Sequence, residues 1–204
     1  MEHLEQMNVF VSTIYVIQKP EFLEPVKLVS DRYLEQVKNG SQLTMSGDYS
    51  GDPEVSEFAR YVSQTAWNIL SSQGYDMDNL VTMFTEMWTQ QYQYAASMDQ
   101  HFHGAGSQIS AFYFLSVPEN SNQLIVYDPR AAKVIINLRE KDTKKISHAS
   151  PHIFLTPKAG MLILTNSWLP HSFTRNGSQE PMEFIHMNLT VMPAPIEPSN
   201  VEVV

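Results

Sequence analysis

The first eighty residues of the chain are expected to form one strand followed by two amphipathic helices. Residues 9–17 are β-branched and aromatic, a composition typical of a strand. Apolar residues recur at helical spacing between Pro20 and Gly40, which predicts a first helix. A second helix is predicted between Asp52, a suitable N-cap, and Gly74, a suitable C-cap. Its apolar stripe predicts that it covers one face of a sheet.

From about Val81 the pattern changes to short apolar or alternating runs that are separated by turn residues. These runs are 81–94, 108–117, 123–128, 133–140, 152–156, 160–166, 171–174 and 182–191. Many short strands at this spacing favour a sandwich or a closed double sheet over a parallel α/β sheet. We therefore expect a single domain, 1–204, that is mainly β with flanking helices. It would comprise a strand and helices over 1–80, a β-rich core over 81–192, and a surface tail over 193–204.

Composition and charge narrow the classes of partner. The 204 residues include 22 Asp and Glu against 13 Lys and Arg, for a formal net charge of −9. An acidic surface repels phosphate backbones, so no nucleic-acid partner is expected. No apolar run is long enough to span a membrane, and no signal peptide is recognisable. The chain has no cysteine, which excludes thiolate chemistry and fits a cytoplasmic location.

Two histidines one residue apart form the first candidate for chemistry. His101 and His103 occur in the stretch HFHGAGSQIS. On a strand, residues two apart point to the same face, so both imidazoles could reach one metal ion. Gly104 and Gly106 would let the backbone turn tightly around such a site. A solvated pair at the end of a strand is the alternative interpretation.

Two later segments supply further candidate ligands. His171, in NSWLPHSF, follows the apolar run 160–166 and could complete three ligands on one side of a metal. The opposite side would then stay open, as in catalytic sites. Asp128 lies in YDPR, where it is either a turn residue or a carboxylate that serves the metal site. Arg130 of the same segment could hold an acidic co-substrate.

Together these motifs resemble a known superfamily. Their order along the chain is HFH, SAFYFLSVP, LIVYDPR, PKAGMLILTNSWLPHSF and HMNLT. This order resembles the iron- and 2-oxoglutarate-dependent oxygenases, and it is most similar to a bacterial and phage group of unassigned substrate. The resemblance covers about Trp88 to Asn188. It implies a double-stranded β-helix, or jelly roll, with the metal inside one end of the barrel, and Fe(II), 2-oxoglutarate and O2 as cofactors and co-substrates.

The chain departs from the superfamily pattern at two places. The usual ligands are His-x-Asp or His-x-Glu and a distal histidine, whereas His103 stands here at the carboxylate position, which leaves Asp128 as an alternative third ligand. The Arg-x-Ser pair that usually holds 2-oxoglutarate falls on Met182 and Phe184. Arg130 and Arg175 are therefore the candidates to replace the missing arginine. Strand alternation also places His186 on the face of Met182 and Phe184, either as a core histidine or as a ligand.

The expected function is hydroxylation of a small molecule or peptide by an Fe(II)- and 2-oxoglutarate-dependent dioxygenase. His101, His103 and His171 would bind the metal. Tyr113 would donate a hydrogen bond to the co-substrate, unless it is a core aromatic residue. Two alternatives stay open: a jelly-roll binding module without activity, and a cupin-like three-histidine dioxygenase that needs no 2-oxoglutarate. The helices could also pack against a second copy, which leaves a homodimer open.

Overall fold

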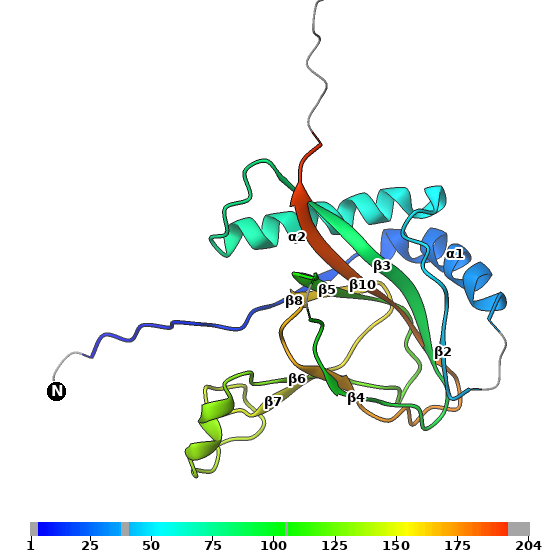
Figure 1. The fold of residues 1–204 in the computed structure, drawn as a ribbon. Helices are drawn as coiled ribbons and strands as arrows, with labels where there is room; N and C mark the ends of the chain where they lie inside the picture. The colour runs from blue at the N-terminus through cyan, green and yellow to red at the C-terminus, as the bar shows by residue number, and fades with distance from the viewer. Residues whose placement is uncertain (1–3, 38–40, 105, 196–204) are drawn as a thin grey trace, which may run out of the picture.

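Two antiparallel sheets face each other and enclose the interior of the protein (Figure 1). The computed structural model describes residues 4–37, 41–104 and 106–195. The larger sheet has six strands in the order β1-β8-β5-β10-β3-β2, and the smaller has four in the order β4-β9-β6-β7. Every strand pairs with its neighbours in antiparallel fashion. The predicted mainly β, jelly-roll architecture is confirmed.

Seven of the eight predicted runs form strands. The larger sheet contains β1 (Ile14–Gln18), β2 (Leu43–Met45), β3 (Leu80–Tyr92), β5 (Ile109–Ser116), β8 (Met161–Asn166) and β10 (Met182–Pro193). The smaller sheet contains β4 (Met98–His101), β6 (Leu124–Tyr127), β7 (His152–Leu155) and β9 (His171–Phe173).

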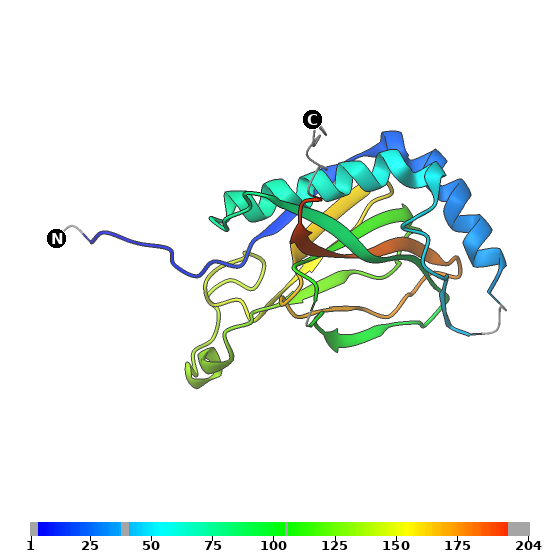
Figure 2. The same ribbon diagram turned by 45° about the horizontal axis from the view of Figure 1, so that its top comes forward.

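Both predicted helices lie on the outer face of the larger sheet, as Figure 2 shows. They are α1 (Leu23–Glu35) and α2 (Ser56–Ser72), and each follows a 3₁₀ turn, η1 (Pro20–Phe22) or η2 (Pro53–Val55). Asp52 caps the 3₁₀ turn η2 that leads into the second helix, since its Oδ1 accepts a hydrogen bond from the Glu54 N–H at 2.9 Å. Gly74 follows the end of that helix with a φ of 91°, as its predicted role requires. Gly40 lies outside the described residues.

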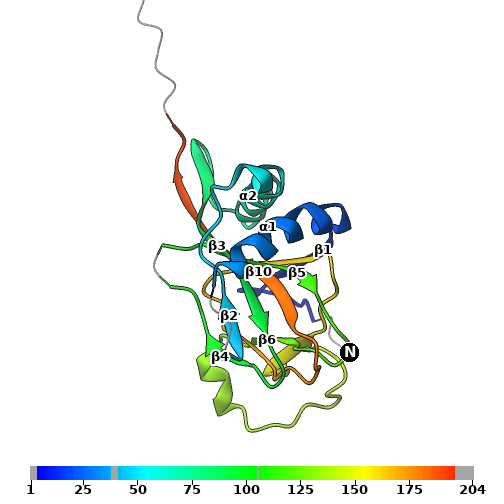
Figure 3. The same cartoon turned by 90° about the vertical axis from the view of Figure 1, so that its right-hand side faces the viewer.

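The larger sheet lies between the helices and the smaller sheet (Figure 3). Its strands separate two apolar cores, one on each face. Along β10, Ile185 and Met187 pack beneath the helices, whereas Met182 and Phe184 pack into the interior between the sheets. Strand β5 alternates in the same way and is buried over nearly all its length. The interior core is strongly aromatic and includes Tyr92, Phe112, Phe114, Phe173 and Phe184. The period of two along the central strands thus decides which side chains can reach the interior.

Two predicted strands are corrected by the structure. The run 133–140 pairs with no strand; η3 (Ala131–Ile135) occupies its start and projects from the sheets in Figure 1. Its apolar side chains are exposed, 86% for Val134, so the apolar run does not mark the buried face of a strand. At the N-terminus the strand begins only at Ile14, which pairs with Thr165 near the end of β8. Residues further upstream have no partner strand to continue the ladder.

Within the ranges that the structure describes, neither helix is long and apolar enough to cross a membrane. Of the predicted surface tail, residues 196–204 lie outside those ranges.

Replacing Thr89 by Val tests the contact between α1 and the larger sheet. The buried Thr89 hydroxyl bonds the Ser30 hydroxyl at 2.7 Å and the Tyr49 hydroxyl at 2.8 Å. Valine keeps the shape but leaves two buried hydroxyls without this partner. We expect urea denaturation to show a loss of about 1–3 kcal/mol in the free energy of unfolding. Thr65→Val is the control because Thr65 bonds only Tyr61 of its own helix; equal losses in both variants would contradict the prediction.

Candidate metal centre

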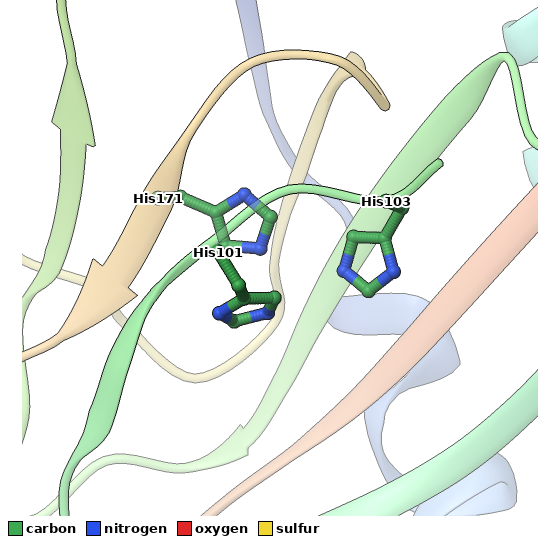
Figure 4. Close-up of side chains that lie close together, drawn as sticks. All are labelled: His101, His103 and His171. Atoms are coloured by element: carbon green, nitrogen blue, oxygen red, sulfur yellow. The ribbon is translucent and has the colours of Figure 1, made fainter. Parts of the chain in front are cut away.

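Three histidines converge where β4 and β9 pair (Figure 4). His101 ends β4 and His171 begins β9, and the two are cross-strand partners. His103 follows in the next loop, whose position is fixed by a 2.9 Å hydrogen bond from its backbone N–H to the Ser167 carbonyl. One ring nitrogen from each histidine lies within 4.8 Å of the others. These three residues, predicted as ligands, are therefore brought together.

The backbone conformation that positions His103 differs from the prediction. The sequence suggested that His101 and His103 share one face of a strand, but β4 ends at His101. The loop turns instead, and Gly106 adopts a φ of 102°, a conformation that favours glycine. The turn brings His103 over the interior, where its ring stacks with His171 at a centroid distance of 5.3 Å.

Hydrogen bonds fix which nitrogen is free in two of the three rings. Nδ1 of His101 lies 2.8 Å from the Asp99 carbonyl oxygen, and Nδ1 of His171 lies 3.0 Å from that of Leu169. A carbonyl oxygen only accepts, so both Nδ1 atoms carry the proton and both Nε2 atoms keep a lone pair. Metal-binding histidines are usually oriented in this way. The Nε2 atoms of His103 and His171 are buried and have no hydrogen-bond partner among the described residues.

The third ring is oriented by an amide. Nδ1 of His103 lies 3.2 Å from the side-chain amide of Asn188. The same amide nitrogen donates to a Glu86 carboxylate oxygen at 3.2 Å, and a carboxylate only accepts, so the nitrogen faces His103 and Nδ1 of His103 accepts. Nε2 of His103 then carries the proton, and binding of a metal there requires this proton to move to Nδ1 and the amide to turn its oxygen toward the ring. Asn188 is 2% exposed and also contacts the Ser110 hydroxyl, so it holds His103 from within the barrel.

Burial keeps His103 and His171 uncharged near neutral pH. Desolvation, and secondarily the neighbouring histidines, lowers the pKa of His103 and of His171 to about 4. Neutral imidazole is the form that binds metals, and it suits Fe, Zn, Cu and Ni. A divalent ion held by three neutral rings would keep both of its positive charges. The donor set thus fits the iron that the resemblance implies.

Asp128, the alternative third ligand, is engaged elsewhere. Its Oδ2 accepts hydrogen bonds from Arg130 at 2.8 Å and from Lys133 at 2.7 Å, and Arg130 chiefly holds the pKa of this carboxyl well below its usual value. Its Oδ1 accepts from the Arg130 backbone N–H, as in a turn. Val126, not Asp128, is the cross-strand neighbour of His171, so the carboxylate lies outside the histidine group. Arg130, paired with Asp128, does not enter the interior either.

The other predicted anchor for a co-substrate also lies away from the histidines. Arg175 is exposed and follows β9 beyond the end opposite His171. Met182 and Phe184, at the positions expected for Arg-x-Ser, are fully buried in the aromatic interior. No Lys or Arg is buried anywhere in the described ranges. The interior therefore holds no cationic side chain for a carboxylate.

Tyr113 lies on the wrong face of its strand for the predicted role. Phe112 faces the interior and contacts His171 at a ring distance of 5.2 Å. Tyr113, one residue later, packs beneath the helices against Phe58 at 4.8 Å. Its hydroxyl donates to the Lys19 carbonyl at 2.7 Å. The phase of β5 makes Tyr113 a core residue that ties the strand to the segment before η1.

His186 and Trp88 are the neighbours of the site that sequence reasoning found only partly. His186 faces the interior, as alternation predicted, and its ring lies 4.6 Å from that of His103. Trp88, its cross-strand partner, lies against it at 4.4 Å. Nothing in the sequence singled out Trp88, since the pairing of β3 with β10 spans almost a hundred residues.

A cavity of about 430 Å³ opens beside His103. Its wall is mainly apolar and aromatic, with Phe102, Trp168 and Met77 among the lining residues. Asn166 and Gln108 contribute polar groups. Apolar walls with a few polar groups are typical of sites for organic ligands.

Replacing Tyr113 by Phe tests the corrected role of this residue. Loss of the hydrogen bond to the Lys19 carbonyl should lower the free energy of unfolding by about 1 kcal/mol. The metal content of the purified protein should stay unchanged, because the hydroxyl lies on the helix side of the sheet. Chemical denaturation and elemental analysis measure the two effects. Loss of metal in the Phe variant would contradict this placement.

Comparisons with known proteins bear on the family and the fold of the chain. Residues 86–184 match the family described as "Putative 2OG-Fe(II) oxygenase". No curated protein sequence matches the chain.

Solved structures share the fold. A prolyl-4-hydroxylase from Pseudomonas putida aligns with a TM-score of 0.62 and 12% identity, over 88% of this chain and 92% of that one. The α-ketoglutarate-dependent carbocyclase SnoK from nogalamycin biosynthesis gives 0.65 and 10%, over 93% and 85%. The epimerase SnoN, in complex with Fe³⁺, α-ketoglutarate and nogalamycin RO, gives 0.59 and 13%, over 93% and 87%.

At 10–13% identity these structures show the fold alone, and the family match applies to residues 86–184. The narrower grouping with bacterial and phage proteins stays a prediction. The predicted resemblance to the Fe(II)- and 2-oxoglutarate-dependent oxygenases is confirmed over residues 86–184.

Proposed function

We propose that the protein is an Fe(II)- and 2-oxoglutarate-dependent dioxygenase that hydroxylates a small molecule or a peptide. The observation that carries this proposal is the convergence of His101, His103 and His171 above the interior of the jelly roll. Nε2 of His171 keeps a lone pair and is buried without a partner among the described residues, as is usual for a histidine that binds a metal. Three ligands from one side leave the other side for a co-substrate and O2.

The roles of the chain's own residues follow from their contacts. The carbonyls of Asp99 and Leu169 hold two of the rings with Nε2 toward the centre. Phe112 packs against His171 and helps to exclude water from the interior side. The cavity beside His103 is the place for an organic substrate. Bound iron would supply the oxidative chemistry, and the protein supplies binding, orientation and a dry environment.

Both substrate classes occur among the comparison structures. A prolyl hydroxylase was crystallised with a peptide fragment of hypoxia inducible factor, and the epimerase SnoN with nogalamycin RO. The mainly apolar wall of the cavity suits an organic substrate of either class.

A three-histidine dioxygenase that needs no 2-oxoglutarate is the second candidate. The observation that favours it is the apolar pair Met182 and Phe184 at the usual carboxylate anchor. Such an enzyme would consume O2 with its own substrate and release no succinate.

Alanine substitution should separate the proposed ligands from Asp128. His171→Ala removes one of the three imidazole nitrogens that would bind the metal, so bound metal should be lost. The fold should remain, because the apolar residues that pack the strands are unchanged. Asp128→Ala should leave metal binding intact, because its carboxylate pairs with Arg130 and Lys133 instead. Elemental analysis and circular dichroism provide the two readouts. If Asp128→Ala loses metal and His103→Ala keeps it, the third ligand is wrongly assigned.

Spectroscopy and product analysis should distinguish the candidate functions. We expect anaerobic Fe(II) and 2-oxoglutarate to give a weak visible charge-transfer band in the wild-type protein, and O2 to yield succinate. Addition of a chelator should abolish both. Oxygen consumption without 2-oxoglutarate or succinate would favour the second candidate. Absence of bound metal would leave a binding module without this activity.

A further inference from the structure

Two N–H groups in the barrel interior lie beside the histidines without a partner. Nε1 of Trp88 and Nε2 of His186 are both buried and make no hydrogen bond within the described part of the chain. The two residues are cross-strand partners on β3 and β10, and their rings are 4.4 Å apart. Buried polar groups are nearly always hydrogen-bonded, so a neighbouring pair of unpaired ones indicates a missing ligand.

The hydrogen bonds around His186 determine which of its nitrogens carries the proton. The buried Tyr92 hydroxyl has one partner in the described ranges, Oε1 of Gln90 at 2.8 Å, so it gives its proton to that oxygen. The Gln90 amide therefore turns its Nε2 toward Nδ1 of His186, 3.5 Å away. An amide nitrogen cannot accept, so Nδ1 keeps its lone pair and Nε2 of His186 bears the hydrogen.

This tautomer gives His186 a different role from His101 and His171. His101 and His171 have Nε2 lone pairs for a metal, whereas His186 has an Nε2–H that can only donate. Its ring is 2% exposed and lies 4.6 Å from His103. It also stacks on Phe112 at 4.8 Å, which fixes its orientation. His186 and Trp88 therefore offer two oriented donors next to the proposed metal site.

The chemistry of the missing ligand follows from the surroundings. Two neighbouring N–H donors suit a group with two acceptor oxygens, which a carboxylate provides. The deeper anchor is closed, because Met182 and Phe184 fill the positions of Arg-x-Ser. No cationic side chain is buried in the described ranges, so positive charge comes from the metal, which three neutral imidazoles leave uncompensated.

We propose that Trp88 and His186 form a carboxylate-binding pair that takes the place of the Arg-x-Ser anchor and holds a 2-oxo acid beside the metal. This inference rests on the proposed function, because it assumes a metal at the three histidines. In this arrangement, two neutral N–H donors close to the metal bind the carboxylate, and no guanidinium deep in the barrel is needed. The pair would serve 2-oxoglutarate or a shorter 2-oxo acid.

Binding of 2-oxo acids to the Ni(II)-loaded protein tests the pair. Calorimetric titrations with 2-oxoglutarate and with pyruvate give dissociation constants for the wild type and for Trp88→Phe and His186→Phe. Each variant keeps an aromatic ring and removes one donor. The expected result is weaker binding by about 10- to 100-fold, the usual effect of losing a hydrogen bond to a charged group. Nickel content should stay unchanged in both variants.

Trp67→Phe is the matched control. The indole N–H of Trp67 donates to the Leu80 carbonyl at 2.9 Å, outside the interior, so its loss should leave 2-oxo acid binding unchanged.

Variants of Trp88 and His186 that bind as tightly as the wild type would overturn the pair while leaving the proposed function intact. Loss of nickel in His186→Phe would overturn it too, by making His186 a ligand. If the nickel-loaded wild type binds neither acid, the proposed use of 2-oxoglutarate falls together with the pair. Binding of pyruvate alone, weakened in both variants, would support the pair and exclude 2-oxoglutarate.

Discussion

The pairing of β10 between β3 and β5 is the interaction on which the rest of the structure depends. This strand contributes to two cores at once, with Ile185 and Met187 beneath the helices and Phe184 and His186 in the interior. A shift of the register by one residue would exchange the two sets. Polar groups would then lie under the helices, and His186 and Asn188 would leave the site. The chemistry of the interior is thus tied to the same ladder that makes the fold stable.

The interior combines polar rings with an apolar wall. Phe112 contacts both His171 and His186, and Phe184 packs against Phe112 and Phe173. Such packing restricts the imidazoles to few rotamers, because dense cores tolerate little rearrangement. It also removes water, so that hydrogen bonds and charges in the site act in a low-dielectric environment. Rigidity and dryness therefore come from the same aromatic side chains.

Much of the fold and part of the site could be predicted from the sequence. The alternation of apolar residues and the turn residues correctly predicted seven of the eight strands expected after Val81. Asp52 and Gly74 correctly indicated where the second helical segment begins and ends. His101, His103 and His171 were found because imidazole is a common metal ligand and because their order resembles a known motif. Tyr113 was misplaced because its side of β5 depends on the phase of a strand that is buried on both faces. Asp128 and Arg130 were ambiguous because only the fold shows that they satisfy each other. No pattern in the sequence indicated that Trp88 lies beside the histidines, because this position depends on the pairing of β3 with β10, which are far apart in the chain.

The absence of a carboxylate from the histidine group bears on which metals the protein would acquire. Hard cations such as Mg²⁺ and Ca²⁺ prefer oxygen ligands and are poorly matched to three imidazoles. Among transition metals, nitrogen ligands follow the usual order of affinity, in which Ni²⁺, Cu²⁺ and Zn²⁺ bind more tightly than Fe²⁺. Occupancy by iron would then be governed by the supply of metals during folding and not by the site's own preference. Contact with a nickel resin or with traces of zinc would load the same three nitrogens with an ion that cannot perform redox chemistry with O2.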